Sequence, residues 1–155
     1  MTRHPWHPAV VHFPIACWVL ATLVDVSGWF IELPPIPGIE WAGVSHLLLW
    51  GGVLLAVPAI VAGVVDYIRL PEEVQESAEL SRHVAAMAAA WLLFLGAAIW
   101  RVRSAPFASA PSWGIMLLEV AGSACLIVGG RFAAAVVFER IATTYSSRRD
   151  VRSAT

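Results

Sequence analysis

The chain has 155 residues, of which 59% are hydrophobic and only 14% are charged, and its mean hydropathy is +0.73. A soluble domain of this length does not carry so much apolar sequence, so the composition favours one integral membrane domain in contact with lipid. The net charge of −1 gives no indication of nucleic-acid binding.

Four apolar runs are each long enough to cross a bilayer, which takes about 20 residues in a helix. They predict an all-α transmembrane bundle in residues 1–145, up-down-up-down, with spans at about 10–31, 41–67, 83–100 and 113–138. Most of the tryptophans fall near the ends of these runs, as residues at a membrane interface do. The tail of residues 146–155 is polar and arginine-rich, and we expect it to be disordered.

The distribution of arginines predicts the orientation of the bundle. Four spans place both termini on one side of the membrane, and that side carries most of the arginines: Arg3, Arg69, Arg82, Arg140 and those of the tail. The other side carries Arg101 and Arg103. The positive-inside rule therefore predicts a multi-pass protein of the cell inner membrane with both termini in the cytoplasm.

Histidines gather where the chain enters the first span. His4, His7 and His12 lie within nine residues, and Pro8 biases His7 away from helix and into the lead-in. We expect His12 in the first turns of the helix, facing the protein. Deeper in the spans, Asp25 and Glu119 are either buried in protonated form or members of a proton relay.

The second and third spans add two more histidines and an acid. His46 opens the second span on the far side, where it is either a hydrogen-bonded interfacial histidine or a weak second ligand site with Met116. Asp66, near the end of that span, either pairs with Arg131 or accepts a hydrogen bond from a ligating histidine. His83 opens the third span on the same side as His12.

These residues also carry a resemblance. The stretch His7-Pro-Ala-Val-Val-His-Phe-Pro-Ile15, the Gly63-Val-Val-Asp66-Tyr ending, His83 and Gly129-Gly130 resemble domain-of-unknown-function family 2231. The resemblance covers residues 7–138 and departs after Gly130, where Arg131-Phe-Ala-Ala-Ala follows. It implies a bacterial four-helix integral membrane protein that is suspected of binding haem and of working beside redox partners.

We therefore expect a membrane electron-transfer protein with one haem b, whose axial ligands are His12 and His83, with His7 in reserve and Asp66 orienting a ligand. The absence of a Cys-x-x-Cys-His motif fits non-covalent haem, and four-helix bundles hold such groups between facing helices. The chain carries no nucleophile–base pair or phosphate loop, so we do not expect an enzyme acting alone.

Two other functions remain open at this point. The chain could be a non-redox structural or assembly subunit of a larger membrane complex, in which the histidines only cap and pack. It could also hold copper, zinc or iron at a transition-metal site made by His4, His7, His12 and His83.

Overall fold

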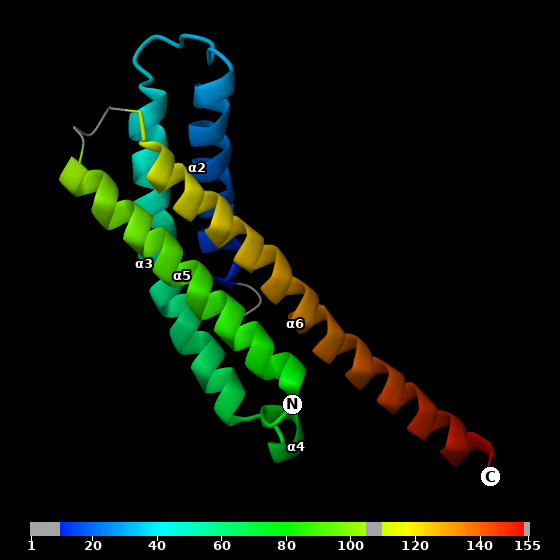
Figure 1. Ribbon diagram of the computed structural model, residues 1–155. Helices are drawn as coiled ribbons and strands as arrows, with labels where there is room; N and C mark the ends of the chain where they lie inside the picture. Colours follow the sequence, from blue (N-terminus) through cyan, green and yellow to red (C-terminus); the bar gives the residue numbers. More distant parts are fainter. Residues whose placement is uncertain (1–9, 105–109, 154–155) are drawn as a thin grey trace.

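The structure is a computed structural model that describes the backbone of residues 10–104 and 110–153. The side chains are described as far as residue 138. Its helices are α2 (His12–Phe30), α3 (Trp41–Ile68), α4 (Glu72–Gln75), α5 (Ala78–Ser104) and α6 (Trp113–Ser153). The four long helices run alternately up and down, with the short α4 in the connection between α3 and α5 (Figure 1). Each long helix contains a segment apolar and long enough to cross a membrane. The predicted all-α four-helix bundle is therefore confirmed.

The helix ends differ from the predicted spans where polar sequence continues the helix. The helix α5 begins at Ala78, ahead of the apolar run, and ends at Ser104, beyond Arg101. The helix α6 continues to Ser153, through most of the tail for which composition predicts disorder. An apolar run marks where lipid contact is favourable, whereas a helix ends where its backbone hydrogen bonding stops, so the two boundaries need not coincide.

The bundle is built from two helical hairpins. The helix α2 packs mainly on α3, and α5 mainly on α6, with smaller contacts from α2 to α6 and from α3 to α5 (Figure 1). The C-terminal half of α6 extends beyond the other helices (Figure 1). Large apolar side chains such as Leu23, Leu54, Leu92 and Leu117 are exposed on the outside of the four helices, as lipid contact requires.

The two hairpins meet at a stack of aromatic rings in the core. Trp18 of α2 lies flat on Phe94 of α5, with ring centroids 4.7 Å apart and planes at 4°. A glycine lies close to each ring, Gly52 of α3 next to Trp18 and Gly122 of α6 next to Phe94. All four helices thus contribute to one layer. The absence of side chains at the two glycines lets α3 and α6 approach the rings closely.

We predict that Gly122→Ala destabilises the bundle by about 1–3 kcal/mol, the usual cost of overpacking a core. A Cβ at this position would lie 2.7 Å from the nearest carbon of the Phe94 ring, so the ring or the helix must move. The matched control is Gly130→Ala on the same helix, where a Cβ meets nothing within 4 Å. Thermal unfolding in detergent, followed by circular dichroism, compares the two variants. Equal midpoints would contradict this account of the core.

Candidate functional site

A large cavity lies toward the end of the bundle at which α2 begins. It is partly open and has a volume of about 910 Å³ between α2, α3 and α5, with a contribution from α6, and its walls are mostly apolar. Trp18 and Trp91 are among the lining residues, and the few polar groups include Asp66 and His83. Ligand pockets in proteins have this character, namely a largely apolar volume of about 300–1,000 Å³ with a small number of placed polar groups.

The orientation of His83 is set by one hydrogen bond. Its Nδ1 lies 2.9 Å from the backbone oxygen of Gly129 on α6. Because a carbonyl oxygen can only accept, Nδ1 must carry the hydrogen, and in a neutral imidazole Nε2 then keeps its lone pair. The helices are close at this point, since a Cβ at Gly129 would lie 3.3 Å from the Cβ of Ala86 and would displace the flexible end of the Met87 side chain.

The structure does not bring His12 and His83 together across this cavity. Val11 and Ile15 line the cavity, whereas His12, which lies between them in the sequence, is exposed and is not part of the lining. His4 and His7 lie outside the described residues. Within residues 10–104 and 110–138, no group of three or more histidine, cysteine, aspartate or glutamate side chains is placed to hold a metal ion.

Asp66 is half-buried and lines the same cavity as His83. The acceptor of the His83 Nδ1 hydrogen is the carbonyl of Gly129, so Asp66 does not orient that imidazole through Nδ1. Arg131, the other predicted partner of Asp66, is exposed. Asp66 is thus a polar group of the cavity wall, and its pairing with Arg131 stays a prediction.

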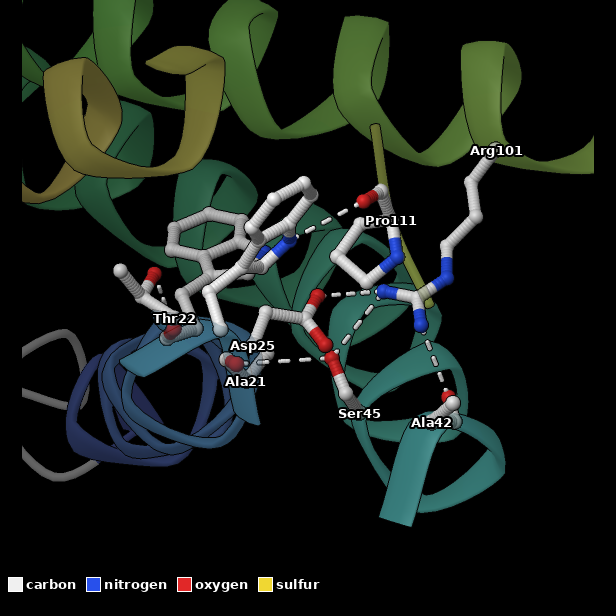
Figure 2. Close-up of polar contacts among 9 residues, drawn as sticks. Ala21, Thr22, Asp25, Ala42, Ser45, Arg101 and Pro111 are labelled. Carbon is white, nitrogen blue, oxygen red and sulfur yellow. Dashed lines mark hydrogen bonds and ion pairs between the residues drawn. The ribbon is translucent and has the colours of Figure 1, made fainter. Parts of the chain in front are cut away.

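A second group of polar residues lies at the opposite end of the bundle. The guanidinium of Arg101, from α5, points between α2 and α3 and pairs with Asp25 (Figure 2). Its Nη1 also donates to the hydroxyl of Ser45 over 3.2 Å, and its Nη2 donates to the backbone oxygen of Ala42 over 2.9 Å. Arg101 is 1% exposed and Asp25 3% exposed, so this ion pair is enclosed by protein.

Two further ionisable side chains complete what we call the loop-end cluster: Asp25, Ser45, His46, Arg101 and Glu119. Glu119 of α6 is fully buried beside Asp25 and within electrostatic range of Arg101. His46 of α3 is buried within range of the same two residues. Met116 is also buried on α6. The ligand role of His46 with Met116 stays a prediction, but the structure places His46 among these charged groups.

Aromatic side chains lie at the same end of the bundle as the loop-end cluster. The Trp29 indole packs on Trp113 with ring centroids 4.5 Å apart, and its Nε1 donates to the backbone oxygen of Pro111 over 3.2 Å (Figure 2). Trp41 donates in the same way to Pro34. These tryptophans lie at helix ends, as expected for interfacial residues.

The sequence reasoning missed the role of Arg101, which it counted as a charge outside the membrane. The structure corrects this, because Arg101 is buried within the bundle. A signal was present: the buried positions Ala90, Phe94, Ala97 and Arg101 recur at the three- and four-residue spacing of one helix face. A basic residue that continues such a stripe must find an acid inside, and Asp25 lies at a matching depth on α2.

The bundle, the apolar cavity and the polar groups held inside the spans define an integral membrane protein of the four-helix class. The chain belongs to the family described as predicted membrane protein, domain-of-unknown-function family 2231, whose model matches residues 3–145. The resemblance found in the sequence motifs is thereby confirmed. No curated protein and no solved structure matches the chain.

We predict that Arg101→Met destabilises the protein by about 3–5 kcal/mol, the usual cost of breaking a buried ion pair by removing one partner. Methionine has a similar length but cannot donate to Asp25, Ser45 or Ala42. Arg103→Met is the matched control, because Arg103 lies two residues away on the same helix and is exposed. Thermal unfolding in detergent measures both variants. A similar, small loss of stability in the two would show that the Arg101 contacts contribute little.

Proposed function

We propose that the protein is a membrane-embedded electron-transfer protein that binds b-type haem in the cavity beside His83. The observation that carries the proposal is the hydrogen bond from His83 Nδ1 to the carbonyl of Gly129, in a side chain that lines an apolar cavity. Imidazoles that ligate metals usually donate their other ring hydrogen to a carbonyl or carboxylate, which fixes the tautomer and the ring orientation.

The cavity suits a large, flat and mostly apolar group. Its volume of about 910 Å³, its apolar walls and its two tryptophans fit a porphyrin better than a small polar solute. Haem bound there would supply a one-electron redox centre, while the chain's own residues hold it, exclude water and tune it through His83. The electron donor and acceptor would be redox partners or other subunits of a larger membrane complex.

His12 is the second axial ligand in this proposal. It begins α2 next to Val11, which lines the cavity, but its side chain is exposed, so it reaches the cavity only after a change in side-chain conformation. His7 is the reserve ligand and lies outside the described residues. The number of histidines bound decides the spin state, since two imidazoles give low-spin haem iron and a single imidazole gives high-spin iron.

We expect purified protein to show a reduced-minus-oxidised spectrum of haem b, which His83→Ala removes. His83→Gln tests the ligand itself, because its amide can still donate to Gly129 whereas it is a poor iron ligand. Added imidazole should restore the spectrum of His83→Ala by occupying the vacated space. Ser81→Ala, which changes another cavity-lining residue, is the matched control and should keep its haem.

The result for His12→Ala then assigns the second ligand. A change from a low-spin to a high-spin spectrum identifies His12, and an unchanged low-spin spectrum assigns the second bond to another residue. Wild-type protein without haem, or His83→Gln with a wild-type spectrum, would refute the haem proposal.

We also propose that both termini lie in the cytoplasm and that the membrane is the inner membrane of the cell. The burial of Arg101 supports this orientation, because it leaves Arg103 as the exposed arginine of the α5–α6 end, against Arg69 and Arg82 at the other. A reporter that is active only in the periplasm, fused after Thr155, should therefore be silent. The same reporter fused after Ser104 should be active, and the reverse pattern would invert the topology.

A further inference from the structure

We propose that Asp25 and Glu119 form a proton-binding site inside the membrane, in which the two carboxyl groups hold one proton between them. The ligand is thus a hydrogen ion, and the site lies at the end of the bundle remote from the proposed haem cavity. This inference does not depend on haem, because it rests on the charges and hydrogen-bond donors of the loop-end cluster alone.

The charges of the loop-end cluster balance only if one of its two acids is protonated. Every long helix presents an ionisable side chain to this cluster: Asp25 from α2, His46 from α3, Arg101 from α5 and Glu119 from α6. Arginine is permanently charged in proteins, so Arg101 balances one carboxylate. If both acids were ionised, with His46 neutral, the cluster would carry one net negative charge within a protein interior surrounded by lipid. An uncompensated buried charge of this kind is strongly unfavourable.

The hydrogen-bond donors of the loop-end cluster are directed to groups other than Glu119. The Nη1 group of Arg101 is bound to Asp25 and Ser45, and its Nη2 group donates to the carbonyl of Ala42 (Figure 2). The hydroxyl of Ser45 in turn donates to the backbone oxygen of Ala21 over 3.4 Å. Among the described residues, no donor reaches either carboxylate oxygen of Glu119, although both oxygens are buried.

Asp25 and Glu119 are buried neighbours inside the cluster, where a hydrogen bond between them needs a donor. Two ionised carboxylates are both acceptors and cannot form one, whereas a protonated carboxyl group donates to its ionised neighbour. One proton therefore satisfies three requirements together: it neutralises the excess charge, gives Glu119 a partner and leaves Asp25 ionised to pair with Arg101. Carboxyl pairs that share a site behave in this way in other proteins.

The test is infrared spectroscopy of the full chain in lipid at neutral pH, without added haem. A protonated carboxylic acid has a C=O stretching band that is separate from carboxylate bands and shifts in D₂O. We expect this band in the wild type and its loss in Glu119→Gln. The amide of glutamine carries its own hydrogens, so it can donate to Asp25 without an added proton. Glu40→Gln is the control, since Glu40 is exposed outside the predicted spans and should be ionised in any case.

Asp25→Asn provides the second, independent variant. With one acid removed, Glu119 becomes the counter-ion of Arg101 and should ionise, so the band should disappear although Glu119 is still present. Absence of the band from the wild type would overturn the proposal, as would a band that survives Glu119→Gln or Asp25→Asn. The haem spectrum of the same variants separates the two proposals. Loss of the infrared band with an unchanged haem spectrum concerns only the proton site, and loss of the haem spectrum with an unchanged band concerns only the haem site.

Discussion

The ion pair between Arg101 and Asp25 is the interaction on which the loop end of this bundle depends. The guanidinium of Arg101 binds α2 through Asp25 and α3 through Ser45 and Ala42, so one side chain of α5 joins the two hairpins. In water such a pair contributes little, but in an enclosed site each group would otherwise carry the cost of an unpaired buried charge. The pair therefore specifies which helix faces meet, more than it adds to the total stability.

Different kinds of contact hold the bundle together at different depths, with apolar packing in the middle and polar contacts at the loop end. The stack of Trp18 on Phe94, with Gly52 and Gly122 close to its rings, holds all four helices together in the middle. On one side of this layer the helices enclose the loop-end cluster. On the other they leave the apolar cavity that contains His83. Trp18 belongs to both the stack and the cavity wall, so the packing of the core also sets the shape of the cavity.

A line of polar groups on α2 runs between these two regions. Asp25 belongs to the loop-end cluster, and one turn along the helix the Thr22 hydroxyl lies 3.3 Å from that of Ser123 on α6 while donating to the carbonyl of Trp18. The proton site and the haem site that we propose therefore lie on one face of one helix.

The sequence by itself determined the membrane class, the four spans and the family, because long apolar runs and a local histidine–proline motif can be recognised without knowledge of any contact between helices. It also singled out Asp25 and Glu119 as ionisable residues inside the spans and His83 as a candidate ligand. The tertiary structure decided which partners these residues have. Arg101 stands 76 residues from Asp25, and the acceptor of His83 is a backbone carbonyl 46 residues away. Such pairings depend on the rotation and depth of each helix in the bundle, which are set by side-chain packing across helices and leave no local pattern in the chain.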